Sequence, residues 1–195
     1  MRNNNENGRE FCVRKEGFMT KNELRREMKR RNLSLSAEER AEASGRIFAE
    51  VASTDAFAAA RTVALYCALP DEPATDGVLE GWASSKRLVV PRVEGDAMRF
   101  FEYDAATLVR GAFGIAEPGP AARECLPGQI DLVVVPGTAF TEAGARMGRG
   151  RGYYDRYLAQ PGFRAVKVGV CFAHQLVGGL ETEPHDVPMD LVVAG

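Results

Sequence analysis

The sequence predicts a single α/β domain built on a mostly parallel sheet. Residues 132–135 and 166–171 are almost continuously apolar, which is typical of strands buried on both faces. Strand-like and helix-like segments alternate from residue 62 onward, and this alternation favours parallel strands joined by helices. The length of 195 residues fits one domain, and we see no internal repeat, low-complexity tract or obvious linker.

The composition is that of a globular protein, with 45% hydrophobic residues, 27% charged residues and a net charge of −2. No apolar stretch approaches the roughly 18 residues of a membrane span, so we expect no membrane association. Four cysteines lie far apart without a CxxC pair, which argues against zinc or a disulfide framework and favours a cytoplasmic location. The near-neutral charge argues against a dedicated nucleic-acid-binding protein.

Residues 1–18 show no apolar periodicity, and we interpret them as a disordered extension or as the product of a mis-annotated start before Met19. Residues 19–195 then form the domain. A first helix is expected from Lys21, with Leu24 and Met28 forming a narrow apolar stripe. A capping box at Ser36 and Glu39 predicts the start of a second helix. The apolar face of that helix consists of Ala43, Ile47 and Val51.

The remaining elements follow in order along the chain. We expect strands at 62–67, 87–91, 98–103, 131–136, 166–172 and 191–194. Helices are expected at 75–84 and 152–160, and a shorter one at 174–180. The second and third strands are expected to form an antiparallel hairpin across residues 94–96. Thr75 is expected to cap the helix that follows it.

The segment 136–156 is the most informative, because it follows a buried strand and opens a helix. Ligands of open α/β sheets bind beyond the carboxyl ends of the strands. Alternating glycines allow the backbone to turn sharply and expose successive N–H groups; these are Gly148, Gly150 and Gly152. The cations of the segment are Arg146, Arg149 and Arg151. Amides, a helix N-terminus and arginines together predict an anion site, most naturally for a polyphosphate.

Asp155 lies one turn into the expected helix, where its carboxylate could hold Mg²⁺ beside those phosphates. The segment matches neither the P-loop pattern nor the dinucleotide-binding fingerprint. Two alternatives stay open at this point. An Arg-Gly tract can bind RNA, and a glycine-rich turn can simply carry solvated arginines.

Other polar residues extend this candidate site. Lys21 and Arg25 share a helix face and could reach a phosphate held in a neighbouring loop, although a solvated face is the plainer interpretation. Glu72 follows the first strand, at the end where ligand groups belong. Asp186 and Asp190 are further candidate partners of Mg²⁺. No zinc-ligand spacing surrounds the two histidines.

Together these segments resemble the 5-formyltetrahydrofolate cyclo-ligase family, whose members are also called 5,10-methenyltetrahydrofolate synthetases. The most specific match is Arg-Met-Gly-Arg-Gly-Arg-Gly-Tyr-Tyr-Asp at 146–155. Four more patterns agree in order and spacing: Lys-x-x-x-Arg at 21–25, Glu-x-x-Thr at 72–75, Gly-Ile-x-Glu-Pro at 114–118 and Glu-Pro-His-Asp-Val-Pro-Met-Asp at 183–190. The resemblance implies a Rossmann-like three-layer sandwich related to sugar-phosphate isomerases and coenzyme A transferases, with N-terminal helices.

The resemblance also implies a reaction. It is the ATP- and Mg²⁺-dependent cyclisation of 5-formyltetrahydrofolate to 5,10-methenyltetrahydrofolate, with release of ADP and phosphate through a phosphorylated formyl group, an imidate phosphate. Such chemistry needs positioning and charge neutralisation rather than a covalent nucleophile. The alternative is a non-catalytic relative that binds folate or nucleotide as a regulator. We expect a cytoplasmic monomer with no nucleic-acid partner.

Site residues follow from the same resemblance. The implied ATP contacts are Lys21, Arg25, Arg146, Met147, Gly148, Arg149, Gly150, Arg151, Gly152, Tyr153 and Tyr154. The implied folate contacts are Cys67, Glu72, Gly114 and Ile115. The implied catalytic groups are Arg149, Tyr154 and Glu72, and the implied Mg²⁺ partners are Asp155, Asp186 and Asp190.

Overall fold

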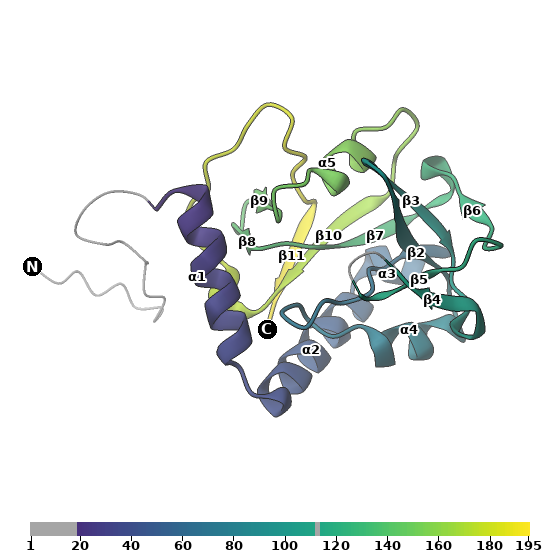
Figure 1. The fold of residues 1–195 in the computed structure, drawn as a ribbon, viewed down its shortest axis with the longest axis horizontal. Coiled ribbons are helices and arrows are strands. Elements are labelled where there is room, and N and C mark those ends of the chain that lie inside the picture. Colours follow the sequence, from purple (N-terminus) through teal and green to yellow (C-terminus); the bar gives the residue numbers. More distant parts are fainter. Residues whose placement is uncertain (1–18, 112–113) are drawn as a thin grey trace, which may run out of the picture.

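A seven-stranded sheet forms the centre of the computed structural model, which describes residues 19–111 and 114–195 (Figure 1). The extension expected at residues 1–18 lies outside the described residues. The strand order is β11-β10-β7-β1-β2-β3-β6. The first five of these strands are parallel to one another, and β3 is antiparallel to both of its neighbours. The mostly parallel sheet expected from the sequence is therefore confirmed.

The strands of this sheet are β1 (Thr62–Ala64), β2 (Arg87–Glu94), β3 (Ala97–Glu102), β6 (Glu124–Cys125), β7 (Leu132–Pro136), β10 (Val166–Cys171) and β11 (Leu191–Ala194). Two small hairpins lie outside it, formed by β4 (Leu108–Arg110) with β5 (Ala116–Pro118) and by β8 (Ala139–Phe140) with β9 (Arg146–Met147). The helices are α1 (Lys21–Ser34), α2 (Ala37–Ala52), α3 (Asp55–Ala59), α4 (Asp76–Ala83) and α5 (Tyr153–Leu158). Short 3₁₀ turns occur at η1 (Ala105–Thr107), η2 (Pro127–Gln129) and η3 (Ala173–Gln175).

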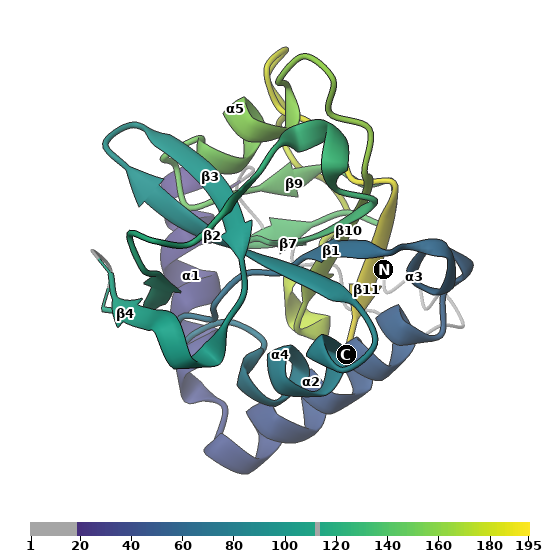
Figure 2. The same cartoon turned by 90° about the vertical axis from the view of Figure 1, so that its right-hand side faces the viewer.

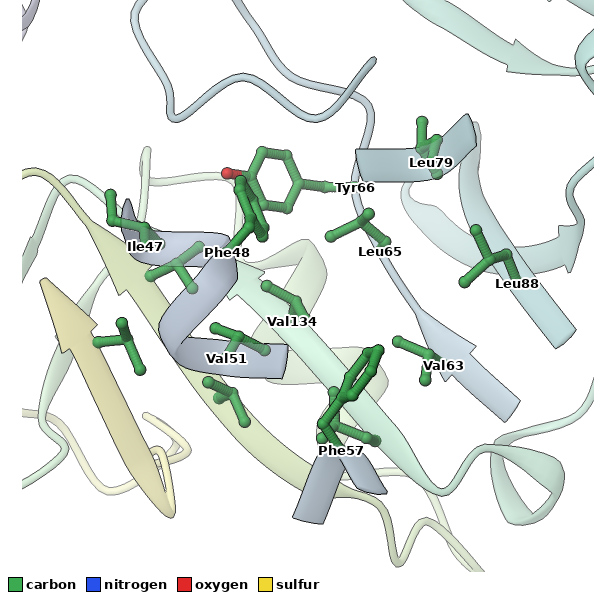
Figure 3. Close-up of a cluster of buried hydrophobic side chains, with 14 of the residues drawn as sticks. Ile47, Phe48, Val51, Phe57, Val63, Leu65, Tyr66, Leu79, Leu88 and Val134 are labelled. Carbon is green, nitrogen blue, oxygen red and sulfur yellow. The ribbon is translucent and has the colours of Figure 1, made fainter. Parts of the chain in front are cut away.

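Helices cover both faces of the sheet, which makes the three layers expected for this chain. Figure 2 shows α5 on one side of the strands and α2 with α4 on the other. On the α2 side, Ile47, Phe48 and Val51 pack over Val63 and Val134 (Figure 3). Successive side chains of a strand point to opposite faces, so the neighbouring positions of β1 and β7 feed a second core beneath α5.

Both N-terminal helices begin as capping boxes. Thr20 and Glu23 exchange hydrogen bonds with each other's backbone at α1, and Ser36 and Glu39 do the same at α2. The expected face of α2 is confirmed, because Ala43, Ile47 and Val51 are all buried. In α1 only Met28 and Asn32 are buried, so this helix packs through a narrow contact.

The expected hairpin between β2 and β3 is confirmed, with Glu94 opposite Ala97 at its tip. Gly95 adopts a left-handed φ of 62° there, a conformation that favours glycine in tight hairpin turns.

Three local expectations need correction. Thr75 occupies the N-cap position of α4 as expected, but its hydroxyl makes no capping bond, because it accepts a hydrogen bond from the Ala68 amide at 3.1 Å instead. The segment 174–180 is not an α-helix but only the turn η3. Gln175 holds that turn by bonds to the backbone of Phe172, Gly137 and Thr138, which draw the chain along β8. The first strand also ends early, at Ala64.

The order of the strands creates a crevice between β1 and β7. The chain leaves β1 through α4 to reach β2 on one side, and it leaves β7 through α5 to reach β10 on the other. Because α4 and α5 lie on opposite faces, the loops after β1 and β7 separate at the carboxyl end of the sheet. Doubly wound sheets bind their ligands at such a point. No helix in the described ranges is long and apolar enough to span a lipid bilayer.

Candidate active site

A cavity of about 760 Å³ occupies this crevice, within the range of about 300–1,000 Å³ that is usual for ligand pockets. Loops after β1 and β7, helix α1, the β2–β3 hairpin and the segment before β11 all contribute to its lining. Two walls differ in chemistry. The cationic wall consists of Lys21, Arg25, Arg149 and Arg151 together with the backbone of 148–150. The apolar wall consists of Cys67, Leu69, Pro91, Val93, Met98 and Ile115.

The glycine-rich loop runs from β9 into α5 along the cationic wall. Gly150 and Gly152 have φ values of 92° and 66°, in the left-handed region where a side chain would be strained. Arg25 reaches across from α1, and its Nε donates to the Gly148 carbonyl at 3.0 Å. Arg25 therefore lies against this loop, whereas Lys21 bonds Glu183, and contact of either residue with a phosphate stays a prediction. Helix α5 spans only six residues, shorter than expected.

Arg146 points inward and anchors this loop. Its Nη2 donates to both oxygens of Asp155 at 2.9 Å, and its guanidinium carbon lies 5.5 Å from the centre of the Tyr154 ring. Only 4% of the Arg146 side chain is exposed, and Nε has no hydrogen-bond partner in the described part of the chain. Asp155 also accepts from the Val187 amide. A metal ion at Asp155 would compete with this buried ion pair.

Arg149 joins the loop to the segment after β1. Its guanidinium contacts both oxygens of Asp71 and donates through Nε to Glu72 Oε1 at 3.0 Å. The other Glu72 oxygen accepts from the Leu69 amide at 2.9 Å. Burial raises the pKa of Glu72, while the Arg149 charge and the Leu69 hydrogen bond oppose that rise. The structure thus brings together Glu72 and Arg149, which are 77 positions apart in sequence.

Asp71 is a site residue that no sequence motif indicated. Its side chain is only 9% exposed, and its backbone carbonyl accepts from Asn32 Nδ2 at 2.9 Å. Asn32 Oδ1 in turn lies 2.6 Å from His174 Nε2. In the sequence, the only sign of this role was that Asp71 stands beside Glu72 in the loop after β1. An Asp-Glu pair in a loop does not by itself indicate a contact with a distant arginine.

The C-terminal segment closes another side of the cavity. Lys21 Nζ lies 2.6 Å from Glu183 Oε1. Asp186 lines the cavity and accepts from the Glu183 amide at 2.7 Å. Asp190 lies outside the cavity lining, and its carboxylate bonds the backbone and side chain of Lys167. Of the three expected Mg²⁺ partners, only Asp155 and Asp186 share this cavity.

Some of the expected folate contacts line the cavity and others do not. Cys67 and Ile115 belong to the apolar wall, whereas Gly114 is not among the lining residues. Burial raises the pKa of the Cys67 thiol to about 12, so this thiol is protonated at neutral pH and suits packing rather than nucleophilic chemistry. Burial also raises the pKa of Tyr154, which keeps its hydroxyl protonated.

This chemistry fits a polyphosphate beside a ligand with some apolar surface. Arginines in a fork geometry and backbone amides at glycines are the usual ligands of phosphates. No group of three or more His, Cys, Asp or Glu side chains within residues 19–111 and 114–195 forms a ready metal cluster. The oxygens of Asp155 and Asp186 are nevertheless of the type that Mg²⁺ prefers when phosphates complete its coordination.

A sequence model of the 5-formyltetrahydrofolate cyclo-ligase family matches residues 18–195, nearly the whole chain. The chain belongs to this family. The cyclo-ligase of Mycolicibacterium smegmatis is 33% identical over 144 residues, covering 68% of this chain and 73% of the relative. The mouse cyclo-ligase is 28% identical over 184 residues, covering 87% and 91%.

Solved structures of cyclo-ligase relatives share the fold. The 5,10-methenyltetrahydrofolate synthetase of Aquifex aeolicus aligns with a TM-score of 0.81 and 34% identity over 90% of both chains. The synthetase of Mycoplasma pneumoniae aligns with a TM-score of 0.73 and 27% identity, over 90% of this chain and 98% of that one. The resemblance drawn from the sequence motifs is therefore confirmed, as is the fold that it implied.

Proposed function

We propose that the chain catalyses ATP-dependent cyclisation of 5-formyltetrahydrofolate to 5,10-methenyltetrahydrofolate. The formyl oxygen attacks the γ-phosphorus of ATP and ADP leaves, which gives an imidate phosphate. The N10 amine then attacks the former formyl carbon. Phosphate departs with the formyl oxygen, and N10 loses its proton. Every bond is accounted for without a covalent enzyme intermediate, and no candidate nucleophile is needed at the site.

The observation that carries this proposal is the contact of Arg149, a residue of the cationic wall, with Glu72. Its guanidinium lies on the cationic wall yet contacts Glu72, which borders the apolar wall through Leu69. A cation at this junction can stabilise the charge of a phosphoryl group that moves from one bound molecule to the other.

The other residues have supporting roles in the proposal. Lys21, Arg25 and Arg151 bind the triphosphate with the backbone of the glycine-rich loop, while Arg146 and Tyr154 keep that loop in shape. Glu72 orients the N–H groups of the folate. Asp155 and Asp186 would hold Mg²⁺, which neutralises phosphate charge when bound. The cysteines within residues 19–111 and 114–195 are free and buried, which suits a reducing cytoplasm; they are Cys67, Cys125 and Cys171.

A direct assay tests the proposal. Protein, Mg-ATP and 5-formyltetrahydrofolate are mixed, and the absorbance of the methenyl product is followed. We expect Arg149→Ala to lower the rate roughly 10- to 1000-fold, whereas Arg46→Ala, at an exposed position of α2, should leave it unchanged. Folded wild-type protein that forms no product would contradict catalysis and leave the binding regulator. Unchanged turnover in Arg149→Ala would refute the role of that residue.

A further inference from the structure

Glu117 is a buried carboxylate in the cavity that none of the roles above uses. It lies in β5, which contacts β2, and only 6% of the residue is exposed. It lines the cavity next to Ile115 of the apolar wall, and its charge influences the Cys67 thiol. A buried carboxylate is costly unless hydrogen-bond donors face it.

Few donors face Glu117 in the described part of the chain. The Val93 backbone amide supplies one hydrogen bond. The neighbouring Arg92 directs its guanidinium elsewhere, to the Glu94 carboxylate and to the carbonyls of Pro118 and Gly119. Burial raises the pKa of Glu117, while the Val93 hydrogen bond and the nearby charge of Arg92 oppose that rise. A carboxylate has about four acceptor positions, so this one retains capacity for donors from a ligand.

The surrounding backbone leaves space for this carboxyl group. Gly111 packs directly against it, and a Cβ atom at Gly111 would overlap the Glu117 carboxyl carbon and Oε2. Any larger residue at 111 would push the carboxyl group from its position. Glu72, the other buried glutamate of the cavity, accepts one hydrogen bond on each oxygen, from Arg149 and from the Leu69 amide, so it has fewer acceptor positions left for the folate than Glu117 has.

We propose that Glu117 binds the two adjacent N–H donors of a 2-amino-4-oxopyrimidine ring, and so selects a pterin at the apolar wall. The inference rests on the proposed function, because 5-formyltetrahydrofolate carries this ring. Its N3–H and 2-amino group lie side by side and match the two oxygens of one carboxylate. The apolar side chains around Glu117 cover the faces of such a ring. Adenine presents a donor beside an acceptor, so it does not fit the same carboxylate.

Calorimetry of 5-formyltetrahydrofolate binding in the absence of ATP tests the role of Glu117 separately from turnover. We expect Glu117→Gln to weaken 5-formyltetrahydrofolate binding about ten- to a hundred-fold, while ATP binding stays unchanged. Glu80→Gln, at an exposed glutamate of α4, is the matched control and should bind both ligands normally. Gly111→Ala keeps the carboxylate but displaces it, so it should weaken folate binding in the same direction.

The ligand can be changed instead of the protein. An analogue without the 2-amino group should bind wild-type protein at least tenfold more weakly than 5-formyltetrahydrofolate, and Glu117→Gln should lose most of that discrimination. This comparison remains decisive if the variant is unstable, because wild-type protein that binds both ligands equally overturns the proposal. Guanosine carries the same donor pair, and a Glu117-dependent preference for guanosine over the folate would also overturn it.

The two proposals fail in different ways. Wild-type protein that binds 5-formyltetrahydrofolate through Glu117 but forms no methenyl product would contradict catalysis and support this inference. Normal folate binding by Glu117→Gln, with the usual turnover, would leave the proposed reaction intact and refute the role of Glu117.

Discussion

Arg149 and Asp71 form a bidentate ion pair, with 2.8 Å between Nη2 and Oδ1 and 3.1 Å between Nη1 and Oδ2. Asp71 itself is fixed by the bond from Asn32 to its carbonyl. The guanidinium is therefore held in one orientation before any ligand binds. Preorganised charge of this kind contributes more to catalysis than a mobile side chain does.

Replacement of Asp71 should therefore affect ATP rather than folate. Asp71→Asn keeps the size of the side chain but removes the charge that aligns Arg149. We expect the KM for ATP to rise about tenfold, while the KM for 5-formyltetrahydrofolate stays within about twofold. Initial rates at varied concentrations of each substrate measure the split. Equal changes in both constants would contradict a positioning role and indicate general damage to the site.

The buried Glu72 carboxyl should make stability depend on pH. Burial raises its pKa from the ordinary 4.5, so the folded protein binds this proton more tightly than the unfolded chain. The contribution of Glu72 to the free energy of unfolding therefore falls as pH rises from the pKa of this carboxyl in the unfolded chain through its higher pKa in the folded protein. Relative to wild type, Glu72→Gln should therefore gain Tm across that interval. A Tm difference that stays constant would show no pKa shift at Glu72, and one that declines with rising pH would show a shift of the opposite sign.

Gly150 should tolerate no side chain. Its φ of 92° is in the left-handed region, and a Cβ atom would lie 3.5 Å from the guanidinium carbon of Arg25. We expect Gly150→Ala to lower the free energy of unfolding by about 1–3 kcal/mol and to weaken ATP binding. Gly81→Ala in α4 has open space around it and should instead stabilise by about 0.5–1 kcal/mol. Urea denaturation of both variants provides the comparison.

The packing around β10 requires glycine at position 169. A Cβ atom there would lie 2.5 Å from the buried Phe140 ring and 3.0 Å from Met189. We expect Gly169→Ala to destabilise by about 1–3 kcal/mol through overpacking. The double variant with Phe140→Leu should be less destabilised than the sum of the single changes, because the smaller side chain makes room. Strict additivity in urea denaturation would show that the two positions do not meet.

Patterns with a short range in sequence predicted the fold well. The capping box at Ser36 depends on residues three apart, and the turn at Gly95 joins adjacent strands. The apolar runs of β7 and β10 predicted central strands because both faces of each are covered. The helix predicted at 174–180 was wrong, since the path of this segment is set by the bond from Gln175 to a distant loop.

Only the parts of the candidate site that lie in local sequence motifs could be predicted. The glycine-rich loop and Glu72 stood out by residue type and by their place after strands. The ion pair from Arg149 to Asp71 spans 78 positions, and no periodicity can reveal such a contact. Arg146 was expected to contact ATP, and although it lines the cavity, its guanidinium is paired with Asp155. Charge counts along the chain cannot separate a buried anchor from a binding group.

Helix α1 buries little of its own surface, yet it carries Lys21 and Arg25 to the site and bonds Asp71 through Asn32. Any anion that bridges Arg25 and the glycine-rich loop then strengthens the attachment of this helix. By thermodynamic reciprocity, a helix that is better attached raises affinity for the anion to the same degree. Attachment of α1 and occupancy of the site thus form a single equilibrium, and protease sensitivity of the N-terminal helix becomes a measure of ligand binding.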